Sequence, residues 1–126
     1  MVKGIREYTF SQLAGKIEGA RDGEANLGNN TAARFVSGGS RMKIAIKLHR
    51  TDIVLLSPDN KYQLFSGGYM TSTTKQRLNN LTPAEIIQKD FGWYVLRNPA
   101  GGKGKDNLIE FYDGIKVDMH GQVISR

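Results

Sequence analysis

The segment from Ser66 to Asn80, SGGYMTSTTKQRLNN, carries the residues best suited to bind a phosphate group. Paired glycines let backbone N–H groups approach an anion, and a Ser or Thr cap begins a short helix whose N-terminus favours negative charge. Cations neutralise phosphate, hydroxyls donate hydrogen bonds to it and a tyrosine ring stacks on a base. The residues predicted to bind here are Gly67, Gly68, Tyr69, Thr71, Thr73, Thr74, Lys75 and Arg77.

The same segment has a purely structural interpretation. It lacks the glycine spacing and the Gly-Lys-Ser/Thr end of a Walker A loop, so its likeness to a phosphate site is chemical only. A Gly-Gly bulge followed by a Thr-capped helical turn would bury Leu78 and Leu81. In either case the side chains of Lys75 and Arg77 are expected to be solvated.

A second group of cations lies between Ala25 and Thr51, a stretch with no Asp or Glu. Its RMKIAIKLH run alternates, so that Met42, Ile44, Ile46 and Leu48 face one side of a strand. The other side would form a continuous positive stripe able to track a phosphate backbone. The alternative is an exposed sheet face whose lysines prevent edge pairing. The binding residues predicted from this stretch are Arg41, Lys43, Lys47, His49 and Arg50.

The sequence offers little for catalysis or metal binding. The chain has no cysteine, and its two histidines, His49 and His120, lie far apart in the sequence. His49 with Asp52 and a nearby hydroxyl would imitate a triad, but sequence proximity does not establish that geometry. No pair of carboxylates has a spacing that indicates acid and base roles. We therefore predict no catalytic residue, no metal and no cofactor.

Composition indicates one basic globular domain spanning residues 1–126, with 39% hydrophobic residues and a net charge of +6. Such a charge favours polyanions such as nucleic acid, although solubility alone also explains it. The N-terminus shows no signal-peptide core, and the longest aliphatic run, Ile53 to Leu56, is too short to span a bilayer. An intracellular protein that does not enter membranes is expected.

Two helices are predicted. Phe10 to Asp22 places apolar residues at helical spacing, with Ser11 available as the N-cap. A short helix is expected after the Ser66–Gly68 motif. Asp22 to Asn30 is dense in Gly and Asn and is predicted to be a loop.

Strands account for most of the rest. The pattern predicts a turn at Gly38 and Gly39, a hairpin around Ser57 to Lys61 and another at Asp113-Gly114, with Trp93 in the core and Tyr94 more exposed. Asn98 to Asn107 is predicted to be a mobile loop whose Lys103 and Lys105 reach backbone phosphates. The predicted strands are Thr31–Ser37, Arg41–His49, Asp52–Ser57, Tyr62–Ser66, Glu85–Lys89, Trp93–Arg97, Leu108–Tyr112 and Ile115–Met119.

These elements indicate an α+β fold that is mostly β. We predict an antiparallel meander over residues 31–124, built as a twisted sheet or a partly open small barrel. A helical N-terminal segment, residues 1–24, would pack on this β-rich core.

The combined pattern GNNT, KLHRTDIV, SGGYMTSTTKQRLN, GWYV and FYDGIKVD resembles a family of small proteins encoded by tailed bacteriophages. The resemblance spans about residues 28–121. Its specific part is Ser66 to Gly68, Thr71, Thr73 to Lys75, Arg77 and Asn79, with Tyr69 at an aromatic position and Leu78 where Ile is usual. It implies phage origin and action in the bacterial cytoplasm, and it transfers no activity to these residues.

Three functions therefore stay open. The first is a non-enzymatic accessory protein that binds phosphate-bearing ligands, above all nucleic acid. The second is an anti-defence inhibitor that sequesters a nucleotide signal or blocks a host bacterial protein. The third is a minor virion component. Polynucleotide binding would weaken steeply with salt, whereas a compact nucleotide pocket would not.

Overall fold

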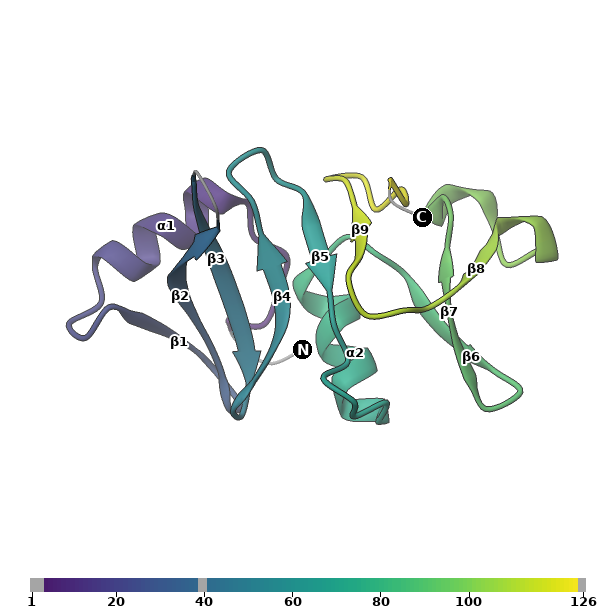
Figure 1. The fold of residues 1–126 in the computed structure, drawn as a ribbon, viewed down its shortest axis with the longest axis horizontal. Helices are drawn as coiled ribbons and strands as arrows, with labels where there is room; N and C mark the ends of the chain where they lie inside the picture. Colours follow the sequence, from purple (N-terminus) through teal and green to yellow (C-terminus); the bar gives the residue numbers. More distant parts are fainter. Residues whose placement is uncertain (1–3, 39–40, 125–126) are drawn as a thin grey trace.

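The computed structural model describes residues 4–38 and 41–124. Within these ranges the chain forms two antiparallel sheets and two α-helices (Figure 1). The larger sheet has six strands, in the spatial order β1 (Glu24–Gly28), β2 (Thr31–Gly38), β3 (Arg41–Leu48), β4 (Thr51–Leu56), β5 (Tyr62–Leu64) and β9 (Ile115–Val117). The smaller sheet comprises β6 (Ile86–Lys89), β7 (Gly92–Leu96) and β8 (Leu108–Glu110).

The helices occupy different parts of the molecule (Figure 1). Helix α1 (Phe10–Glu18) packs against β1, β2 and β3, and helix α2 (Ser72–Leu81) contacts β4 and β6, so it links the two sheets. Neither sheet closes into a barrel. The predicted mostly β, antiparallel fold with two helices is confirmed, in its twisted-sheet form.

The register of the larger sheet separates an inner face from an outer face. Ile44 lies opposite Leu56 and Ile46 opposite Val54, and all four side chains are fully buried on the inner face. Residues that alternate with them, such as Lys43 and Lys47, point to the outer face. The inner face forms the core together with side chains of the N-terminal segment, Ile5, Tyr8, Leu13 and Ile17.

Helix α1 begins at the predicted residue but is capped differently. Thr9, in extended conformation, accepts a hydrogen bond from Gln12 N, and the Gln12 side chain accepts one from Thr9 N at 2.9 Å. This capping box places Ser11 inside the first turn, so the predicted Ser11 cap is wrong. The helix ends at Glu18, four residues before the predicted Asp22, with Gly19 as its C-cap.

The loop predicted over residues 22–30 is also wrong, because β1 occupies most of it. Ala25 and Leu27 alternate with polar residues and are buried against the inner side of the sheet. Asn29 and Asn30 then adopt positive φ values of 45° and 60° and turn the chain into β2. The Asn residues therefore belong to the turn after β1. Burial of the two apolar side chains Ala25 and Leu27 holds β1 as an edge strand of the sheet.

The chain does turn at Asp113-Gly114, where Gly114 has a φ of 98°. The predicted hairpin is nevertheless wrong, because β8 pairs with β7 and β9 pairs with β5 in the other sheet. The turn carries the chain from one sheet to the other. Beyond it, Met119 was predicted to face inward and is 52% exposed.

The remaining predicted strands are present, several of them shorter. The hairpin around residues 57–61 is confirmed by the pairing of β4 with β5. Trp93 is buried, as predicted, with its ring edge-on to Phe111 at 5.3 Å, and Tyr94 is partly exposed. The Gly39 half of the predicted Gly38-Gly39 turn lies outside the described residues.

Candidate functional site

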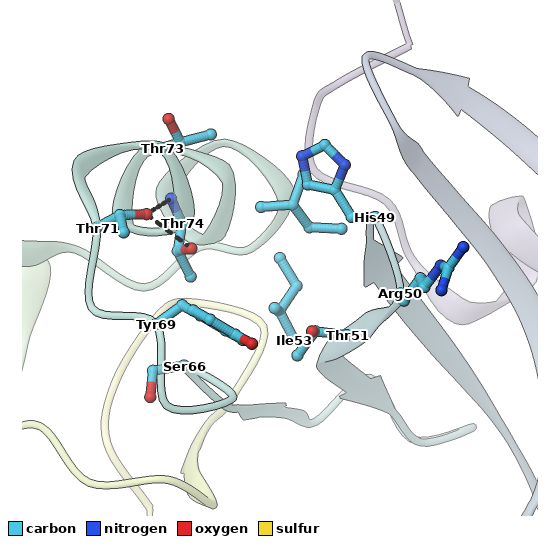
Figure 2. A pocket seen from close by; sticks show the side chains of 10 residues that line it. His49, Arg50, Thr51, Ile53, Ser66, Tyr69, Thr71, Thr73 and Thr74 are labelled. Atoms are coloured by element: carbon cyan, nitrogen blue, oxygen red, sulfur yellow. Dashed lines mark hydrogen bonds between the residues drawn. The ribbon is translucent and has the colours of Figure 1, made fainter.

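A cavity of about 520 Å³ opens at the end of the β3–β4 hairpin, facing the start of α2 (Figure 2). Its floor is apolar, formed by the buried side chains of Leu48 and Ile53. Hydroxyl groups and aromatic rings form its rim. The lining residues are Leu48, His49, Arg50, Thr51, Ile53, Ser66, Tyr69, Thr71, Thr73 and Thr74.

One wall is the tight turn between β3 and β4. His49 adopts a positive φ of 58° there, and its N–H donates to Asn30 O at 2.6 Å. His49 was predicted on the polar face of the strand, but it belongs to the turn and lies at the rim of the cavity. Arg50 is exposed, and Figure 2 shows its guanidinium directed away from the other lining side chains.

The Gly67-Gly68 turn lies behind the opposite wall. Both glycines have positive φ, 66° and 85°, and a Cβ on Gly67 would lie 2.1 Å from the Thr51 methyl group. Asp113, distant in sequence, accepts hydrogen bonds on Oδ1 from Ser66 N at 2.7 Å and Ser66 Oγ at 2.9 Å. Gly68 N–H was predicted to donate to an anion, but it donates to Ser66 Oγ at 3.1 Å and is therefore used within the turn.

Helix α2 contributes its first turn to the cavity (Figure 2). Thr71 is the N-cap, and its hydroxyl accepts from Thr74 N at 3.2 Å and bonds the Thr74 hydroxyl at 3.1 Å. These two hydroxyls are therefore occupied in starting the helix. Thr73 is exposed and borders the cavity beside the positive end of the helix dipole.

Tyr69 supplies the largest exposed ring at the site. Its side chain is 63% exposed and extends across the cavity toward Thr51 and Ile53 (Figure 2). The Tyr69 N–H donates to Ser66 O at 3.1 Å, which ties the backbone of Tyr69 to the glycine turn. The ring is thus held at the rim without being packed into the core.

The two predicted groups of cations do not meet in this cavity. Lys43 and Lys47 lie on the outer face of the sheet, whereas Leu48 and the start of α2 lie on the inner side. Lys75 and Arg77 follow the first turn of α2 and do not line the cavity. Both residues are partly buried, and the buried Nε atom of Arg77 contradicts the prediction that this side chain is solvated.

Arg77 is the more constrained of these two cations. Its Nε atom is buried and has no hydrogen-bond partner among the described residues. The side chain of Arg41 lies outside the described part of the structure.

The predicted positive stripe is interrupted by acids from neighbouring strands. Lys47 Nζ lies 3.0 Å from Glu24, and Arg34 forms a two-pronged ion pair with Asp52 at 2.7 and 2.9 Å. The hydrogen bond from Arg34 lowers the pKa of Asp52, so this carboxylate stays charged. Both pairs cancel positive charge on the outer face.

The same ion pair removes the weak triad considered from the sequence. Both carboxylate oxygens of Asp52 are held by Arg34, and His49 lies in the turn. Among residues 4–38 and 41–124 no group of three His, Cys, Asp or Glu side chains is placed to hold a metal ion. No helix in these ranges is long and apolar enough to cross a membrane.

The loop Asn98–Asn107 is held by two asparagine side chains. Asn98 Oδ1 accepts from Ala100 N at 3.1 Å, and Asn107 Nδ2 donates to Asn98 O at 2.8 Å and to Gly102 O. Its lysines, Lys103 and Lys105, are exposed and lie outside the cavity.

Four cavity residues are not among the predicted binding residues: Leu48, Thr51, Ile53 and Ser66. Leu48 and Ile53 are typical core residues of strands, and their role as a floor comes from a register shift between β3 and β4 at Ile46 and Lys47. Thr51 follows the turn directly. Its position beside the predicted binding residues His49 and Arg50 was the one feature of the sequence that indicated a place at the site.

Comparison with known proteins identifies the family. No significant match was found among curated proteins or among solved structures. A family model described as Kyanoviridae Gp96 protein matches residues 15–123, which is most of the chain. The match agrees with the phage origin expected from the sequence. The chain therefore belongs to the Kyanoviridae Gp96 protein family of phages.

Proposed function

We propose that this phage protein binds a phosphate-bearing nucleotide unit in the cavity between the β3–β4 turn and α2, and that it does not transform it. The observation that carries the proposal is the meeting of His49, Tyr69 and the first turn of α2 around one apolar floor. Ligand pockets of about 300–1,000 Å³ with few polar groups are the usual size for small ligands.

The parts of the cavity suit the parts of a nucleotide. The exposed ring of Tyr69 offers a stacking surface for a base, and the apolar floor excludes water beneath it. The first N–H groups of α2 and the Thr73 hydroxyl offer donors to a phosphate, in the field of the helix N-terminus. The imidazole of His49 adds a hydrogen-bonding group at the opposite rim.

Ion pairing on the outer face favours this cavity over the strand stripe as the main site. Lys47 and Arg34 each face a carboxylate within 3.0 Å, and counterion release needs cations that are free to neutralise phosphates. A single-stranded nucleic acid that inserts one unstacked nucleotide and a free nucleotide signal share the same chemistry at the cavity. Action in the infected bacterial cell is part of the proposal.

The test is fluorescence anisotropy of labelled single-stranded DNA, duplex DNA and RNA over a salt series, with nucleoside monophosphates as competitors. Tyr69→Ala should weaken binding roughly five- to hundredfold, since stacking is worth about 1–3 kcal/mol per base. Phe91→Ala is the matched control, because Phe91 is an exposed ring of the smaller sheet that is 99% accessible.

The outcomes separate the candidate functions. Binding of single strands with a steep salt slope, lost in Tyr69→Ala and kept in Phe91→Ala, supports the nucleic-acid form of the proposal. Competition by free nucleotides that survives moderate salt supports sequestration of a nucleotide signal. Equal loss in both variants, or no binding of any probe at low salt, refutes the cavity as the site and leaves a host protein or the virion as the partner.

A further inference from the structure

A second hollow, of about 400 Å³, adjoins the cavity at His49, which lines both spaces. It lies at the turn between β1 and β2, and Figure 1 shows this turn at the same end of the molecule as the β3–β4 turn and the start of α2. The polar side chains that line the second hollow include Asp22, Glu24, Asn26, Asn29, Asn30 and Lys47. We call this space the amide hollow.

A backbone hydrogen bond fixes the two spaces relative to each other. His49 N–H, in the β3–β4 turn, donates to Asn30 O, in the β1–β2 turn, at 2.6 Å. Both turns have defined conformations, since Asn29, Asn30 and His49 adopt positive φ values of 45°, 60° and 58°. The cavity and the amide hollow are therefore held side by side by the main chain.

The amide hollow offers hydrogen bonds that the protein itself leaves unused. Asn29 and Asn30 are exposed, and within the described residues their side-chain amides form no hydrogen bond. Asn26 Oδ1 accepts from Gly28 N at 2.8 Å, which leaves the Asn26 NH₂ group as a donor. Each side-chain amide carries two donors and one acceptor oxygen, so the hollow can satisfy a ligand that has both kinds of group.

The charges of the amide hollow favour an uncharged ligand group over a phosphate. Lys47 Nζ lies 3.0 Å from Glu24, and Asp22 adds a further carboxylate to the lining. A base or a sugar fits such a lining. Asparagine amides pair with the edge of adenine, and carboxylates accept from exocyclic amino groups.

We propose that the ligand consists of at least two linked nucleotide units, with the first unit in the cavity and the base and sugar of the second in the amide hollow. This inference rests on the proposed function and specifies its ligand, which can be a free dinucleotide or a segment of a single strand. The phosphodiester between the two units would pass His49, where an imidazole N–H can donate to it.

The test is a set of NMR chemical-shift titrations with deoxyadenosine monophosphate, the deoxyadenosine dinucleotide and the corresponding hexanucleotide. Asn29→Gly with Asn30→Gly removes two amides of the hollow, and glycine readily adopts their positive φ values. Phe91→Gly is the matched control, because it replaces an exposed turn residue with a φ of 69° that lines neither space. Far-UV circular dichroism confirms that both variants are folded.

The dinucleotide should bind the unmodified protein about tenfold more tightly than the monophosphate, which corresponds to one or two added hydrogen bonds. The asparagine variant should lose this gain and keep its affinity for the monophosphate, and Phe91→Gly should change neither. With the proposal supported in this way, tighter binding of the hexanucleotide with a steep salt slope identifies a single strand as the ligand. Equal affinities for the hexanucleotide and the dinucleotide identify a free dinucleotide.

Three results would overturn the inference and leave the cavity as the nucleotide site. They are equal affinities for the monophosphate and the dinucleotide, a gain that survives in the asparagine variant, and an equal loss of both affinities in that variant. Absence of binding by all three probes would overturn the proposed function as well, so the two failures are distinguishable.

Discussion

Gly67→Ala tests how tightly the glycine turn is fitted against the β3–β4 hairpin. The new Cβ would lie 2.1 Å from Thr51 Cγ2, whereas carbon atoms pack best at about 3.5–4.0 Å. Thr51 is β-branched and lies at the start of β4, so its methyl group cannot rotate away freely. Either the turn or the strand must move.

The expected loss of unfolding free energy in Gly67→Ala has two parts, and a control variant separates them. Alanine at a φ of 66° costs about 1–2 kcal/mol through left-handed backbone strain, and overpacking adds about 1–3 kcal/mol. Gly68→Ala carries only the first part, because its φ is 85° and no atom lies within 4 Å of its Cβ. We expect a loss of unfolding free energy of about 2–5 kcal/mol for Gly67→Ala and about 1–2 kcal/mol for Gly68→Ala.

Urea denaturation followed by the fluorescence of the buried Trp93 measures both variants. Thr51→Ser removes the methyl group, so it should recover most of the overpacking part in the Gly67→Ala background. The reasoning is refuted if Gly67→Ala costs no more than Gly68→Ala, or if Thr51→Ser gives no recovery.

Three further predictions concern single contacts. Asp113→Ala removes the acceptor of both Ser66 hydrogen bonds and should cost roughly 2 kcal/mol in urea denaturation; an unchanged midpoint would show that the turn is held otherwise. Phe91→Gly should raise the unfolding free energy by about 1 kcal/mol, because Phe91 has a φ of 69° and a solvated ring; a loss would mean that the ring makes stabilising contacts. Hydrogen bonds from Ser57 and then Lys61 lower the pKa of Asp59 from 3.8 to about 2. Ser57→Ala should bring this pKa back toward 3.8 in an NMR titration, and the stability from this carboxylate, present above 3.8, should be lost as pH falls toward 2. No change of the Asp59 pKa would contradict this assignment.

Local pattern predicted the central hairpins well. The alternation from Met42 to Leu48 and the turn at residues 57–61 depend on neighbours in sequence, and both are present in the structure. The same rules placed a turn at Asp113-Gly114 correctly. They could not tell that Ile115 and Val117 would be buried beside β5, because that pairing depends on which sheet edge is left uncovered.

The charge on the outer face shows the limit of sequence reasoning about sites. The stretch from Ala25 to Thr51 has no acid, yet Glu24 stands directly before it and Asp52 directly after it. Antiparallel pairing of β1 with β2 and of β3 with β4 brings these two acids next to cations of the stretch. Glu24 forms an ion pair with Lys47, and Asp52 forms one with Arg34. A stripe that looks continuous along the sequence is therefore interrupted at Lys47 by a carboxylate from another strand.

The cavity was predictable in its parts and not as a whole. Tyr69, Thr71 and Thr73 were selected for their chemistry, and they do border one space with His49. The floor of Leu48 and Ile53 arises from a register shift that leaves no local signal. Long-range contacts decide which of the candidate residues share a site.

The most direct test of the central claim is an amide NMR titration of the protein with adenosine monophosphate and with a short single-stranded DNA. The account predicts that the largest shifts occur at His49, Tyr69 and Thr73, and that Tyr69→Ala suppresses them. Shifts confined to other surfaces, or none at millimolar ligand, would contradict it.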